Sequence, residues 1–177
     1  MTPAVSLAGR VVGWPVWKHA KLKYLRLMSD VIDAAKSERD WLSLQARVQE
    51  INRRYPPTAL VDASTYSHAF TSRTRAEAQI ALMQTALAVH LYKLRNNRLP
   101  QSLAQAQIAL GRPLPNDPFS GALLRYRRDG ARCILYSIGP NVRDDGGKEP
   151  EARTLATTEP AKEPDDITLV LEAPRRK

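Results

Sequence analysis

Apolar side chains return every three or four residues over much of the first hundred positions, which is the period of a helix with one apolar face. The first such run begins at about Trp17, and its apolar positions are Leu25, Met28 and Ile32. Lysine and arginine occupy other positions of the run, so it predicts an amphipathic helix. Residues 1–16, which include Gly13 and Pro15, are predicted to be irregular.

A second amphipathic helix is predicted downstream of Ser37, whose hydroxyl can cap a helix start. Its apolar stripe consists of Trp41, Leu44, Val48 and Ile51. The Tyr55-Pro56-Pro57 sequence is expected to end it, because the residue before a proline avoids helical geometry. Residues 56–73 are rich in Pro, Thr and Ser and predict a linker.

The third helix has the clearest start signal. Thr74-Arg75-Ala76-Glu77 matches a capping box, in which the hydroxyl and the carboxylate each bind a free backbone N–H group. Its apolar face consists of Ile80, Met83, Leu87, Leu91 and Leu94. Asn96-Asn97 and Pro100 are expected to end it, and a short helix is predicted from position 100 or 102 to 110, where Gly111 stops it.

After Gly111 the period of the pattern shortens to two. Turn-forming residues occupy positions 114–121, and the predicted strands cover residues 123–127, 132–138 and 167–171. Arg128-Asp129-Gly130 supplies a turn between the first two strands. The predicted fold class is therefore α+β, with N-terminal amphipathic helices and then a long helix packed on a small three-stranded antiparallel sheet. Residues 1–70 are expected to form a helical N-terminal region with a linker, and residues 71–177 an α+β domain.

The net charge of +9 lies mostly in the first three quarters of the chain, and a basic balance of this kind raises nucleic acid or an anionic surface as partners. The candidate nucleic-acid-binding residues are the arginines around the predicted hairpin, namely Arg125, Arg127, Arg128 and Arg132. Tyr126 and Tyr136 could stack on bases. The simpler interpretation is that these arginines keep an exposed sheet soluble. It is favoured, because no nucleic-acid-binding motif accompanies the charge.

Nothing in the sequence predicts an enzyme. His19, His68 and His90 lie in separate segments, and no phosphate-binding glycine loop, nucleophile motif or metalloprotease motif is present. We therefore expect no catalytic residue and no small-molecule substrate. Cys133, the one cysteine, lies in an apolar strand and is expected to be a buried, unreactive thiol.

One acidic loop offers oxygen ligands for a hard cation. The candidate side chains are Asn141, Asp144, Asp145 and Asp166, and carbonyls near Ile138 can add to them. Nearby glycines allow the backbone to bend around an ion. Ca²⁺ takes oxygen ligands of these types, although the spacing is not that of an EF-hand. The alternative is a solvated acidic loop in which an Asp-Gly pair forms a turn.

Several segments between residues 82 and 167 also occur in the order that is typical of one family. They are Tyr92-Lys93-Leu94-Arg95-Asn96-Asn97-Arg98-Leu99-Pro100, Asp117-Pro118-Phe119-Ser120-Gly121, Leu124-Arg125-Tyr126, Tyr136-Ser137-Ile138-Gly139-Pro140-Asn141, Gly146-Gly147 and Asp165-Asp166-Ile167. In this order they resemble the C-terminal globular domain of the major pseudopilin of type II secretion systems. The resemblance covers about half of the chain. It implies a long helix, a turn, a three-stranded sheet and a final loop.

The resemblance also implies a structural Ca²⁺ in the final loop. It carries over to Asn141, where the family tends to have Asp, and to Asp166. Residues 1–70 match neither the cleaved leader nor the long apolar helix of that family. The chain is therefore expected to be a pseudopilin-like domain on a different N-terminal region, or the tail of a longer anchored protein.

These expectations describe a non-enzymatic structural or interaction protein. Its partners would be other proteins or further copies of itself, and nucleic acid is disfavoured. It is expected in the bacterial cell envelope or at its periplasmic face, close to a membrane through an anchor outside this chain. If the chain is complete as printed, a cytoplasmic location is expected instead.

Overall fold

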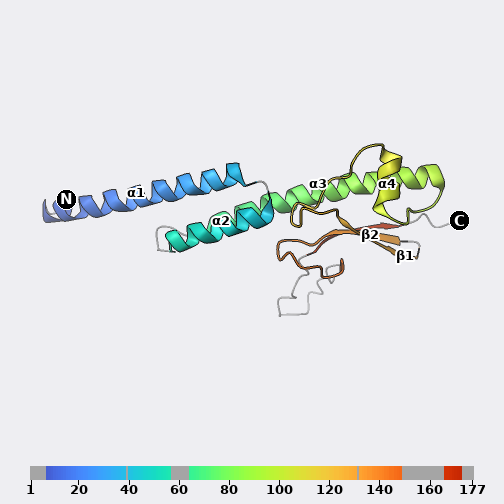
Figure 1. Cartoon of the computed structure of the whole chain (residues 1–177). Coiled ribbons are helices and arrows are strands. Elements are labelled where there is room, and N and C mark those ends of the chain that lie inside the picture. Colours follow the sequence, from blue (N-terminus) through green and yellow to red (C-terminus); the bar gives the residue numbers. More distant parts are fainter. Residues whose placement is uncertain (1–6, 39, 57–63, 131, 149–165, 173–177) are drawn as a thin grey trace, which may run out of the picture. The chain divides into compact units, whose positions relative to one another are not determined.

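The computed structural model describes residues 7–38, 40–56, 64–130, 132–148 and 166–172. Within these residues the chain forms four helices and one three-stranded antiparallel sheet, so the predicted α+β class is confirmed (Figure 1). The chain divides into two compact units. The first comprises residues 1–39 and 43–69, and the second comprises residues 40–42 and 70–177.

The first unit contains helix α1 (Leu7–Ser37) and most of helix α2 (Trp41–Arg54). Helix α1 begins ten residues before the predicted start, and it continues through Gly13 and Pro15, so the expectation of an irregular start is wrong for residues 7–16. Ser37 is the last residue of α1 and its hydroxyl contacts Glu38, so it does not cap α2.

The buried face of α1 also differs from the prediction. Leu27, Val31 and Ala34 are buried, whereas Leu25 and Ile32 are about half exposed. Apolar residues occur on more than one side of this helix, so its periodicity fits two adjacent faces, and packing selects one of them. The stripe of α2 is confirmed, because Trp41, Leu44 and Ile51 are buried and Val48 is half-buried.

Helix α3 (Ser64–Asn96) begins ten residues before the predicted capping box. Residues 64–73 are therefore helical and not a linker, while residues 57–63 lie outside the described residues. Thr74 is buried inside the helix, where its hydroxyl donates a 3.1 Å hydrogen bond to the carbonyl of Phe70. A threonine within a helix can satisfy its own hydroxyl by bonding to the carbonyl four residues back, so the Thr–Glu spacing does not mark a start here.

The predicted apolar face of α3 is not its buried face. From residue 78 onward the buried residues of α3 are mostly small: Ala78, Ala81, Leu82, Thr85, Ala88, Val89 and Tyr92. Several of them form one hydrophobic cluster with Cys133 and Leu135. Small side chains allow a sheet to approach a helix closely, which leaves the larger aliphatic residues on the other side.

The sheet is a meander of β1 (Arg125–Asp129), β2 (Arg132–Ser137) and β3 (Ile167–Glu172), with β2 in the middle. Figure 1 shows the strands along the C-terminal half of α3. Helix α4 (Leu103–Leu110) ends as predicted at Gly111, which adopts a left-handed φ of 73°. Strand β1 starts two residues later than predicted, because Leu123 instead forms an isolated bridge with Asn116. The described residues include no helix with a stretch both long and apolar enough to cross a membrane.

Candidate functional site

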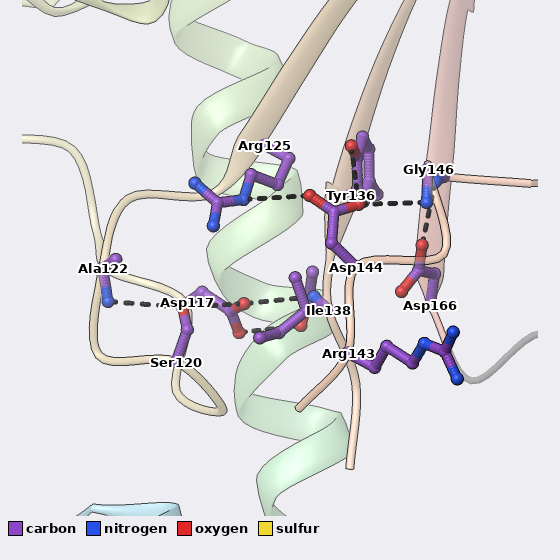
Figure 2. Close-up of polar contacts among 12 residues, drawn as sticks. Asp117, Ser120, Ala122, Arg125, Tyr136, Ile138, Arg143, Asp144, Gly146 and Asp166 are labelled. Atoms are coloured by element: carbon purple, nitrogen blue, oxygen red, sulfur yellow. Dashed lines mark hydrogen bonds and ion pairs between the residues drawn. The ribbon is translucent and has the colours of Figure 1, made fainter. Parts of the chain in front are cut away.

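The candidate site is the loop of residues 138–147, together with Asp166 at the start of β3; we call it the acidic loop. Its first residue is fixed by Asp117, which is 1% exposed. The Asp117 carboxylate accepts hydrogen bonds from Ser137 Oγ at 2.7 Å and from the backbone N–H of Ile138 at 3.2 Å. It also accepts a bond from Phe119 N at 3.0 Å. A further bond comes from Ser120 Oγ at 3.2 Å, and Figure 2 shows Asp117 between Ser120 and Ile138. These contacts tie the turn before β1 to the end of β2.

Trp41 provides a second fixed point for the acidic loop. Its indole N–H donates a 3.2 Å hydrogen bond to the carbonyl of Pro140. Its ring packs edge-on against Phe119, with the ring centroids 5.2 Å apart and an interplanar angle of 76°. Both Trp41 and Phe119 are buried, so the loop begins on a rigid base.

Asp144 is held by donors from the sheet and from its own loop. Its Oδ1 accepts hydrogen bonds from the hydroxyl of Tyr136 at 3.1 Å and from the backbone N–H of Gly146 at 3.0 Å. Its Oδ2 lies 3.5 Å from Nε of Arg125. Burial and the Asp144 carboxylate together raise the pKa of Tyr136, which keeps its hydroxyl protonated as the donor.

Asn141 and Asp145 close the tip of the loop. Asn141 Nδ2 donates to Asp145 Oδ2 at 3.2 Å, and Asn141 Oδ1 accepts the N–H of Arg143 at 2.8 Å. Val142 between them has a φ of 56°, which is uncommon for a β-branched residue. The side chains of Asn141 and Asp145 are thus used to bend the backbone.

Asp166 is the unusual member of the acidic loop. Its Oδ2 accepts the N–H of Gly147 at 2.8 Å, whereas its Oδ1 is buried and has no hydrogen-bond partner among the described residues. Burial raises the pKa of Asp166, the N–H groups of Gly147 and Asp145 oppose that rise, and the carboxylates of Asp145 and Asp144 add to it. A buried carboxylate oxygen without a donor is costly, so this position favours a proton or a cation.

The oxygen donors in the loop match a hard cation in kind. In the described part of the chain, however, no group of three or more His, Cys, Asp or Glu residues is arranged to hold a metal ion. The structure brings Asp144 and Asp145 close enough to Asp166 to affect its pKa, and it pairs Asn141 with Asp145. Ile138 is fixed through its N–H by Asp117.

Gly147 sets how closely the acidic loop approaches the sheet. It has a φ of 63°, and a Cβ atom there would lie 2.5 Å from Cδ1 of Tyr136. The neighbouring Gly146 also has a positive φ, of 84°, but a Cβ there would meet nothing within 4 Å. Of these two glycines, Gly147 alone therefore needs to be glycine for steric reasons as well as for its backbone conformation.

The four arginines of the nucleic-acid hypothesis are all exposed. Arg125 is paired with Asp144, while Arg127, Arg128 and Arg132 lie toward the hairpin end of β1 and β2. The tyrosine rings do not lie free beside them: Tyr136 is buried, and Tyr126 is half-buried with its hydroxyl bound to the carbonyl of Pro100 at 2.6 Å. Base stacking by these two rings is therefore not supported.

Other expectations concern isolated residues. His19, His68 and His90 are exposed. Cys133 is fully buried in the hydrophobic cluster, as predicted, and burial raises the pKa of its thiol.

The sequence interpretation missed the roles of Asp117 and Trp41. Asp117 carried a usable signal, since an Asp followed by Pro and then by Ser three positions on is typical of a turn in which the carboxylate binds nearby backbone N–H groups. Trp41 carried no such signal, because its bond to Pro140 joins residues that are 99 positions apart.

In the comparisons with known proteins, no family model, curated protein or solved structure matches this chain.

Proposed function

We propose that this protein is a non-enzymatic structural or interaction protein whose second unit is a pseudopilin-like domain with a calcium-stabilised acidic loop. The observation that carries the calcium part is the buried Oδ1 of Asp166, which has no donor among the described residues. Two more carboxylates, of Asp144 and Asp145, lie near enough to disfavour its ionised form. A divalent cation would offset that repulsion.

The order of elements supports the pseudopilin-like part of the proposal. A long helix is followed by a short helix, a turn organised by Asp117, a three-stranded antiparallel sheet and a loop before the last strand. The resemblance in sequence implies the same succession. On this proposal the partners are other envelope proteins or further copies of the chain, met at the periplasmic face of a membrane.

Asp166 and Asp145 are the side chains proposed to hold Ca²⁺, with Asp144, Asn141 and the carbonyl of Ile138 as further oxygen sources. The ion would supply charge neutralisation and loop closure and would take part in no reaction. The protein itself supplies the rigid base through Asp117 and Trp41. Ordering a loop that has no core of its own is costly, so an ion at its base would stabilise the fold.

The test is calcium binding by the full chain. We expect millimolar Ca²⁺ to raise the Tm, and Tb³⁺ to give emission sensitised by Tyr136, whose hydroxyl contacts Asp144. Asp166→Asn should abolish both effects while keeping an oxygen that can accept the N–H of Gly147. The matched control is Asp129→Asn, an exposed carboxylate of the hairpin, which should respond to both ions as the parent does. Identical responses in the parent and Asp166→Asn would exclude the site.

A second candidate function is binding to nucleic acid or an anionic surface. It is favoured by the exposure of Arg127, Arg128 and Arg132 near one hairpin. Such binding should weaken steeply as salt is raised. Affinity for a short DNA duplex that is unchanged in the combined Arg125→Ala, Arg127→Ala and Arg128→Ala variant would exclude these arginines as its source.

A further inference from the structure

Five large aliphatic residues form a stripe on the side of α3 that faces away from the sheet; we call it the outer stripe. They are Ile80 (57% exposed), Met83 (66%), Leu87 (64%), Leu91 (36%) and Leu94 (69%). The opposite side of the same helix packs on the sheet through small residues such as Ala81 and Ala88. A contiguous exposed row of this kind is typical of an interaction surface, whereas scattered exposed apolar residues are ordinary.

The intervals between the residues of the outer stripe are the same whether they are counted from its first residue or from its last. From Ile80 to Leu94 the steps are three, four, four and three residues, so Leu87 is its centre. Two such helices that pack antiparallel about Leu87 would place Ile80 opposite Leu94 of the other copy, and Met83 opposite Leu91. Each stripe would then be complementary to itself, as the two-fold symmetry of a homodimer requires.

The charges at the edges of the stripe favour the antiparallel arrangement. The middle is bordered by Gln84 and His90, and no Lys, Arg, Asp or Glu borders it there. Successive residues of a helix are rotated by about 100° around its axis. Seen along the axis of α3, Glu77 and Arg95 therefore both lie roughly 80° to the same side of Leu87, and they lie at opposite ends of the stripe. In an antiparallel pair, Glu77 of each copy lies beside Arg95 of the other, whereas in a parallel pair it lies beside Gln79.

Both of these charged groups are exposed and have contacts within one copy. Glu77 accepts a 3.0 Å bond from Nε of Arg73, and Arg95 donates to the carbonyl of Ala109 in α4. A carboxylate accepts several hydrogen bonds and a guanidinium donates five, so these contacts leave capacity for a second copy. Ile108, next to Ala109, is itself 80% exposed.

The size of the surface suits a reversible dimer. The five side chains expose roughly 500 Å² per copy, so a pair would bury about 1,000 Å², near the lower bound for a specific interface. Residues of α3 that border the stripe, such as Gln84 and His90, would add to this area. Interfaces near this bound are typical of weak or transient complexes, so association is expected only at high protein concentration.

We propose that two copies of this chain associate through antiparallel packing of their outer stripes, centred on Leu87. The inference deepens the interaction role proposed above and rests on it, since it names a second copy of this chain as the partner. It uses no feature of the acidic loop. A monomeric chain whose Tm still rises with Ca²⁺ would therefore overturn the dimer alone, and a dimer that shows no such rise would count only against the calcium loop.

Sedimentation of the full chain between about 10 µM and about 1 mM tests the association, because interfaces of this size are typical of weak complexes. The parent should shift from monomer to dimer over this range. Leu87→Glu places two carboxylates at the two-fold axis and should weaken the dimer by at least about 100-fold. Leu25→Glu, at a residue of α1 that is 52% exposed, is the matched control and should leave the dimer unchanged.

Cross-linking tests the orientation. Ile80→Cys and Leu94→Cys are made as separate chains, one of them with a short tag, while native Cys133 is fully buried. Antiparallel packing predicts a disulfide between the two variants when they are mixed and oxidised, and much less within either variant alone. Cross-linking of each variant with itself would overturn the antiparallel arrangement. A parent that stays monomeric throughout, or that uses the stripe to bind lipid vesicles as a monomer, would overturn the dimer.

Discussion

The carboxylate of Asp117 accepts a hydrogen bond from the hydroxyl of Ser137, with 2.7 Å between the two oxygens, and both residues are buried. Asp117→Ala would remove this acceptor and leave several buried donors without a partner. We expect a loss of about 3 kcal/mol or more in the free energy of unfolding. Ser137→Ala removes one bond only and should cost about 1 kcal/mol. Urea denaturation measures both values.

Asp129→Ala is the control for these variants, because Asp129 is exposed at the hairpin and should tolerate the change within about 0.5 kcal/mol. An Asp117→Ala protein as stable as Asp129→Ala would show that the Asp117 contacts do not hold the turn to β2.

The adjacent glycines Gly146 and Gly147 allow the cost of a steric clash to be measured separately from the cost of an unfavourable backbone conformation. Gly146→Ala meets only open space and should cost about 1 kcal/mol, the usual penalty for a left-handed alanine. Gly147→Ala has the same backbone penalty and also drives a methyl group into the Tyr136 ring. We expect roughly 2–4 kcal/mol for it. Thermal and urea unfolding of the pair measure the difference, and equal losses would exclude close packing between Gly147 and Tyr136.

The raised pKa of Asp166 predicts how the stability of the protein depends on pH. Its pKa is raised above 3.8 in the folded state, chiefly by burial, so the folded protein binds a proton that the unfolded chain has already lost. In the absence of Ca²⁺, this residue's contribution to stability should therefore fall as pH rises from about 3.8 through its folded pKa. Below that window the residue is protonated in both states and carries no penalty.

Asp166→Asn removes the titration and keeps an oxygen that can accept the N–H of Gly147. The stability of Asp166→Asn relative to the parent should increase with pH across this window and then level off. Urea unfolding in EDTA at a series of pH values measures it. A difference between the two proteins that is the same at every pH would contradict the assignment.

Trp41 joins the start of α2 to the acidic loop across 99 positions of sequence. Trp41→Phe removes the hydrogen bond to Pro140 and keeps an aromatic ring beside Phe119, so it should cost about 1 kcal/mol. Trp41→Ala also removes the ring and should cost roughly 3–5 kcal/mol. Chemical denaturation compares the two, and equal losses would show that the ring contact contributes nothing beyond the hydrogen bond.

Features that depend on local signals agree with the sequence predictions. The α2 stripe, the stop of α4 at Gly111 and the order of the three strands each follow from periodicity or turn residues within a short window. Element starts were predicted less well. Thr74 carries the pattern of a helix cap but bonds to Phe70 inside a longer helix, because the hydroxyl has two ways to be satisfied.

The sequence alone was enough for the α+β order of elements, because each element carries its own period and its own breakers. It did not decide which side of α3 is buried, since that helix has one face of small residues and another of large aliphatic ones. Only the tertiary structure decided this, because the sheet approaches the face with the shorter side chains. The tertiary structure also leaves the outer stripe exposed, and among the described residues it buries Asp166 with no donor to its Oδ1.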